Sequence, residues 1–224
     1  MRDVRKNWLR LLTHLGALLP LAALLWDWQH DGLTVNPIQE ITFRTGKTAL
    51  VLLVLALACT PLNSALGVKQ ALPLRRPLGL YAFGYACLHV LTFTVLDYGL
   101  DVELLWQELS QKRYVLVGFA AFLLLTPLAL TSTRGWMRRL GRRWKRLHRL
   151  VYLAALLVIV HFVWLVKADH REPLTYGAIV VGLLALRLPP VRRALARMRP
   201  GRRVTATIDR AASYGRETVK RAQR

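Results

Sequence analysis

Apolar residues along the chain gather into six long blocks that are separated by shorter polar or charged segments. The blocks cover residues 8–28, 46–66, 77–98, 113–133, 149–167 and 174–189. A helix that crosses a bilayer needs about 17–25 apolar residues; most blocks reach this length, and the last is the shortest. None of them carries Asp, Glu, Lys or Arg in its central stretch. The pattern predicts an all-α membrane protein, a six-transmembrane-helix bundle over residues 1–189.

Lys and Arg are distributed very unequally between the two sets of connecting segments. The N-terminal arm holds four, the link after the second block three, the link after the fourth eight, and the tail from Arg187 twelve. One side of the bundle thus receives 27 of the 33 Lys and Arg, and the other side receives nine of the 12 Asp and Glu. Cytoplasmic segments carry the excess of positive charge, so both termini are predicted to face the cytoplasm.

The strongly positive net charge of the chain bears on what the protein binds. A soluble protein with a net charge of +21 would suggest nucleic acid. Here the basic segment 190–224 is instead predicted to be a cytoplasmic tail attracted to anionic lipid.

The first block lacks a small-residue cleavage site and is expected to stay as an anchor. Tryptophans near the block ends are expected to lie at the membrane interface: Trp26, Trp28, Trp106, Trp136 and Trp164.

The chain lacks complete sequence motifs for binding nucleotides. Thr45-Gly46-Lys47-Thr48 is similar to the end of a phosphate-binding loop, but Ile41 stands where that loop needs its first glycine, and no strand precedes it. No G-x-G-x-x-G is present, so we expect no dinucleotide-binding domain in this chain. Cys59 and Cys87 lie inside blocks and are predicted to pack rather than pair. No C-x-x-C-H motif, the signature of covalent haem attachment, is present.

His89, His148 and His161 lie in or at the edge of the apolar blocks. An ionisable side chain at this depth is by default a functional-site hypothesis, and imidazole is a common haem ligand. His89 lies about 12 residues into the third block and His161 about 12 residues into the fifth. At 1.5 Å per residue, both are about 18 Å from the cytoplasmic edge. We therefore predict that they ligate one haem, in preference to an interhelical hydrogen bond.

His148 lies at the cytoplasmic membrane edge and allows two interpretations. It could ligate a second cofactor, or it could be an interfacial residue in a basic stretch. The matching depth of the third block holds Arg75, Arg76 and Pro77, so a second haem would need another ligand, for which His14 is the spare candidate. The dense Arg and Lys around His148 follow from topology, and some could also neutralise haem propionates or a flavin phosphate.

Three stretches together resemble one family over nearly the whole chain up to about residue 200. They are Phe43 to Leu50, Arg75 to Phe83 leading to His89, and Trp144 to Tyr152 followed by His161-Phe162-Val163-Trp164. These stretches are similar to the MsrQ (YedZ) haem-binding subunits, which are part of the ferric-reductase-like transmembrane group. The related ferric reductases carry two histidines on each of two helices, whereas the third block here has one.

The resemblance implies a b-type cytochrome of the bacterial inner membrane, with one or two haem b and with FMN. It maps the haem ligands onto His89, His148 and His161. Electrons would enter from the quinone pool or a cytoplasmic flavin reductase. They would leave to a periplasmic molybdopterin methionine-sulfoxide reductase, whose catalysis belongs to that partner. The alternatives are a self-standing ferric or quinone reductase, and a non-redox transporter or membrane scaffold.

Overall fold

The computed structural model describes residues 2–191 and 194, and every regular element among them is helical. The long helices are α1 (Arg2–Gln29), α2 (Pro37–Leu66), α3 (Arg75–Leu91), α5 (Arg113–Leu130), α8 (Leu150–Leu165) and α9 (Arg171–Ala185). The predicted basic tail lies, except for residues 190, 191 and 194, outside the described residues. The all-α class predicted from the apolar blocks is confirmed.

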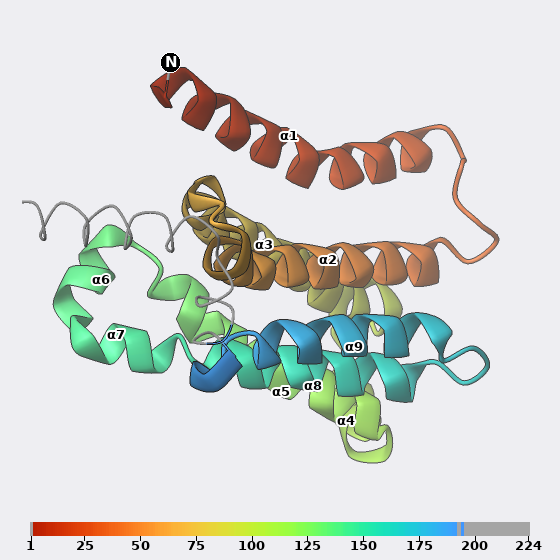
Figure 1. Ribbon diagram of the computed structural model, residues 1–224. Helices are drawn as coiled ribbons and strands as arrows, with labels where there is room; N and C mark the ends of the chain where they lie inside the picture. Colours follow the sequence, from red (N-terminus) through yellow and green to blue (C-terminus); the bar gives the residue numbers. More distant parts are fainter. Residues whose placement is uncertain (1, 192–193, 195–224) are drawn as a thin grey trace, which may run out of the picture.

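Five segments are long and apolar enough to cross a membrane: residues 8–29, 37–66, 69–97, 113–130 and 142–165. Each of them overlaps one of the first five predicted blocks, and the second, third and fifth segments begin several residues earlier than predicted. The sixth block coincides with α9, which has 15 residues and is shorter than the roughly 17 that a spanning helix needs. Helix α9 runs alongside α8 in the bundle (Figure 1). A multi-span membrane protein follows from these segments, while the number of six spans remains a prediction.

Two helix pairs form the centre of the bundle: α2 packs along α3, and α5 packs along α8. Helix α9 covers α8 and also contacts α2, while α1 lies at the edge against α2 and α3 (Figure 1). Small residues are buried where these helices meet, among them Ala17, Ala56, Ala82 and Ala155. In a bilayer, small side chains let helix backbones approach closely and gain dispersion contacts. Contacts of α3 with α5 and of α2 with α9 join the two pairs, so the helices that carry the candidate site belong to one packed bundle.

Helix α2 begins well before the apolar block that predicted it. The Asn36 side chain accepts a hydrogen bond from the Gln39 amide, and Pro37 occupies the first turn, where its missing N–H costs nothing. At the other end, Gly67 adopts φ +77° and closes the helix by donating its amide N–H to the Asn63 carbonyl. The helix is therefore 30 residues long, and residues 42–48 lie on it rather than in a loop.

The links between the long helices contain short helices that the apolar pattern did not predict. Beyond α3 the chain continues as a π-helical segment, η2 (Thr92–Asp97), and then forms α4 (Val102–Gln111), which Asp101 caps. Lys112 ends α4 and pairs with Glu108 at 2.5 Å, and this hydrogen bond raises the pKa of the Lys112 ammonium above its ordinary value. A 3-10 helix, η1 (Lys69–Leu74), joins α2 to α3.

The two ends of the bundle differ in character. The basic helices α6 (Arg134–Leu140) and α7 (Arg142–Leu147) lie at the same end as the start of α1 and the end of α9 (Figure 1). Helix α4 and the α1–α2 and α8–α9 connections lie at the opposite end. The structure thus gathers at one end the segments that the sequence assigned to the more basic side.

Candidate functional site

His89 of α3 and His161 of α8 face each other across the interior of the bundle. Their ring centroids are 6.2 Å apart, and the ring planes are nearly perpendicular at 82°. Both side chains are partly buried. The two helices run in the same direction and carry the histidines at equal depth, which is how the sequence predicted that the two would meet. The structure therefore brings these two candidate ligands together.

Each of the two rings is held by a backbone carbonyl of the neighbouring helix. Nδ1 of His89 lies 2.8 Å from the carbonyl oxygen of Thr42 on α2. Nδ1 of His161 lies 2.7 Å from the carbonyl oxygen of Tyr114 on α5. Because a carbonyl only accepts, each Nδ1 must carry the proton and donate it, which leaves Nε2 unprotonated with a free lone pair. A hydrogen bond of this kind fixes the tautomer and orientation of a metal-ligating histidine.

The donor set of the site consists of two imidazoles. Among the described residues, no group of three or more His, Cys, Asp or Glu side chains is placed to hold a bare metal ion. Two nitrogen donors facing each other suit a metal whose remaining positions are filled by its own macrocycle, as in a haem with two axial histidines. The site therefore fits haem better than an isolated transition-metal ion.

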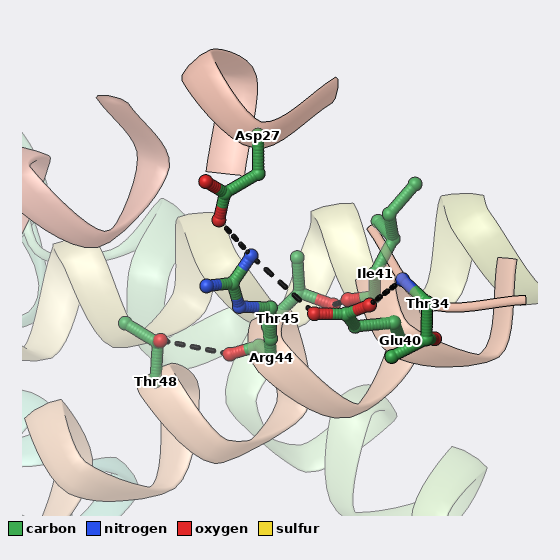
Figure 2. Close-up of polar contacts among 7 residues, drawn as sticks. All are labelled: Asp27, Thr34, Glu40, Ile41, Arg44, Thr45 and Thr48. Atoms are coloured by element: carbon green, nitrogen blue, oxygen red, sulfur yellow. Dashed lines mark hydrogen bonds and ion pairs between the residues drawn. The ribbon is translucent and has the colours of Figure 1, made fainter. Parts of the chain in front are cut away.

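The charged side chains of the stretch Phe43 to Thr48, which follows Thr42 on α2, have a structural role in the bundle. Arg44 reaches Asp27 at the end of α1 at 2.6 Å and Glu40 at 3.6 Å, and Glu40 accepts from the Thr34 amide (Figure 2). Lys47 pairs with Glu172 of α9 at 2.6 Å. These residues tie α2 to its neighbours on both sides. The likeness to a phosphate-binding loop is therefore accounted for by helix packing.

His148 lies apart from the facing pair, where α7 ends. Its Nε2 is 3.2 Å from the Thr131 hydroxyl, and its ring lies against the indole of Trp144 with centroids 4.0 Å apart. The Trp144 Nε1 donates to the Thr131 carbonyl at 2.9 Å, which closes a small cluster between α5 and α7. His14 lies on α1 and contacts the Tyr81 hydroxyl of α3 at 2.9 Å. The two residues considered for a second haem thus make contacts with different neighbours.

Arg75 lies near the His148 cluster at the start of α3. Its Nη1 is 3.4 Å from the Thr60 hydroxyl of α2. The other basic residues named for an anionic group lie on α6 and α7 and are mostly exposed, among them Arg138, Arg139, Arg142 and Arg143. The end of the bundle at which His148 lies therefore also carries several exposed cations.

Sequence reasoning missed Thr42 and Tyr114, which contribute backbone atoms that no side-chain type announces. Each accepting carbonyl lies 47 residues before its histidine. The interval is the same in both helix pairs, so Thr42 and His89 in the first occupy the positions that Tyr114 and His161 occupy in the second.

Comparison with known proteins gives the same picture over most of the chain. Residues 45–159 match the family described as ferric reductase like transmembrane component. The protein-methionine-sulfoxide reductase heme-binding subunit MsrQ of Xanthomonas axonopodis pv. citri (strain 306) is 46% identical over 200 residues, 87% of this chain and 91% of that protein. MsrQ of Caulobacter vibrioides is 40% identical over 190 residues, 84% of this chain and 90% of that protein. The chain therefore belongs to the MsrQ family of ferric-reductase-like transmembrane proteins.

Proposed function

We propose that the chain is a b-type cytochrome subunit in which His89 and His161 are the two axial ligands of one haem. The observation that carries this proposal is the facing pair of imidazoles, each with Nδ1 bonded to a carbonyl. The name of the relatives, heme-binding subunit of a protein-methionine-sulfoxide reductase, supports the same cofactor. When bound, haem supplies reversible one-electron chemistry.

The spacing of the rings fits a single metal atom between them. A bond between a metal and an imidazole nitrogen is about 2 Å long, so two rings that would hold one metal atom must lie within a few ångströms of each other. The observed separation is 6.2 Å. With Nδ1 donating to the Thr42 and Tyr114 carbonyls, the chain holds both rings in the tautomer that a metal ligand needs.

The charge distribution supports an orientation of the chain in the membrane, and the resemblance implies that electrons would cross it outward. The end of the bundle that carries α6, α7 and the start of α1 would face the cytoplasm, since cytoplasmic segments hold the excess of Lys and Arg. Quinol or a cytoplasmic flavin reductase would donate electrons to the chain. The acceptor, a periplasmic molybdopterin methionine-sulfoxide reductase, would dock on the end that carries α4. FMN rests on the resemblance alone, and we assign no residue to it.

Visible spectroscopy tests the proposal on the full chain purified in detergent. A reduced-minus-oxidised spectrum of a low-spin b-type haem is expected, with the stoichiometry measured as pyridine haemochrome. His89→Ala and His161→Ala should each lose this haem, because each removes one axial ligand. His170→Ala is the matched control, since this exposed histidine precedes α9 at the opposite membrane edge. Full haem content in both site variants would refute the pairing.

The alternatives predict different results in the same preparation. A self-standing ferric or quinone reductase, which the family description supports, would reduce ferric chelates or quinone in vesicles without a periplasmic partner. A transporter or scaffold would be colourless even when haem is supplied during expression. The proposed subunit should instead pass electrons to methionine sulfoxide only when the periplasmic reductase is added.

A further inference from the structure

A glycine lies directly against each of the two facing imidazoles. Gly46 is one helical turn after Thr42 on α2, and Gly118 is one turn after Tyr114 on α5. A Cβ atom at position 46 would lie 2.9 Å from Nδ1 of His89, and one at position 118 would lie 2.6 Å from Nδ1 of His161. Both distances are shorter than side-chain carbons tolerate, so each ring occupies space that only glycine leaves open.

The position of each glycine explains how a helical carbonyl can accept from a ring. In an α-helix the carbonyl of residue i points along the axis toward residue i+4. The side chain at i+4 therefore borders the approach to that oxygen. With Gly46 after Thr42 and Gly118 after Tyr114, the approach is clear, and the imidazole reaches the carbonyl while the helix stays intact.

The arrangement occurs twice in the same register. Thr42, Gly46 and His89 in the first helix pair correspond, at a constant offset, to Tyr114, Gly118 and His161 in the second. The α2–α3 and α5–α8 pairs are also the two most extensively packed pairs of the bundle. Two independent helix pairs that share a carbonyl, a glycine and a histidine at equal intervals are hard to attribute to packing alone.

We propose that Gly46 and Gly118 are positioning residues for the two axial ligands. Together with the Thr42 and Tyr114 carbonyls, they form two equivalent seats that fix each ring's position and its Nδ1–H tautomer. This inference rests on the proposed haem site. Groups that orient metal-ligating histidines typically change metal affinity about 10- to 100-fold when they are altered. We expect a loss of haem affinity of that size when either seat is filled by a methyl group.

The experiment compares G46A and G118A with G84A in the full chain. Gly84 lies on α3, the helix that carries His89, and a Cβ there meets no described atom within 4 Å. Haem content, the ferric spin state by electron paramagnetic resonance, and the haem midpoint potential are measured for each variant. G118A should lower haem occupancy and convert low-spin to high-spin haem, and G46A should do so less, because its contact is the longer one. G84A should match the wild type in all three.

The outcomes separate this inference from the proposed function. A colourless wild type, or full haem in His89→Ala and His161→Ala, refutes the haem site itself. In a second outcome, the histidine variants lose the haem while G46A and G118A both keep the wild-type haem content, spin state and midpoint potential. That result refutes only the glycine seats. If neither glycine variant accumulates in the membrane, pulsed paramagnetic resonance of the wild type decides the case. It should detect, for both ligands, the remote-nitrogen quadrupole coupling of an Nδ1–H that donates to a carbonyl, and the coupling of an Nδ1–H without such an acceptor refutes the seats.

Discussion

The guanidinium of Arg187 donates a hydrogen bond to the backbone carbonyl of Leu57, 130 residues earlier in the chain. Pro61 has no N–H, so the Leu57 carbonyl, four residues before it on α2, lacks its donor within the helix. Arg187 also donates to the Tyr152 hydroxyl at 2.8 Å and lies over that ring. One cation just after α9 therefore completes the hydrogen bonding of a broken α2 turn and holds α8 against it.

Arg187→Ala should destabilise the bundle, because the buried Leu57 carbonyl is then left without a donor. A hydrogen bond from a charged group is worth about 1.5–3 kcal/mol, and this is the loss we expect. The measurement is the thermal unfolding midpoint of the detergent-solubilised protein.

Pro61→Ala supplies the control for this prediction. The substitution restores an amide N–H at position 61 that can donate to the Leu57 carbonyl, so Arg187→Ala should cost less in that background than in the wild type. Equal losses in the two backgrounds would mean that Arg187 acts through Tyr152 or through packing instead.

Asp27→Asn should loosen the end of α1 without affecting the histidine pair. Asp27 pairs with Arg44 at 2.6 Å, but Arg44 is 41% exposed, so the ion pair is expected to contribute no more than about 1 kcal/mol. Protease cleavage in the α1–α2 connection should become faster, and the difference should shrink at high salt. Asp31→Asn, in the same connection, is the control. A change in haem content in Asp27→Asn would contradict the assignment of the Asp27–Arg44 ion pair to helix packing alone.

The facing histidines could be predicted from sequence because the rise of a helix is constant. Once the apolar blocks give the direction of each span, counting residues gives depth, and His89 and His161 fall at one level. The short helices in the links could not be predicted this way, because α4, α6 and α7 lie in polar segments without a long apolar run.

The other groups of the site could not be predicted from side-chain types. Thr42 and Tyr114 contribute carbonyl oxygens, which every residue has, and Gly46 contributes the absence of a side chain. Thr42 also falls before the apolar block at 46–66, since Asn36 and Pro37 start α2 earlier than hydrophobicity alone indicates. Only the equal spacing of two glycines from two histidines carries this information, and it gains meaning once the helices are seen to pair.

His148→Ala should leave the haem of His89 and His161 in place. His148 contacts Thr131 and Trp144 at the end of α7, and the contacts that hold the facing pair come from Thr42 and Tyr114 instead. The variant should therefore contain one haem per chain by pyridine haemochrome. If the wild type contains two, the difference assigns the second to His148; if it contains one, His148 is an interfacial residue of the basic end. A colourless His148→Ala protein that still folds would show that the two regions form a single site.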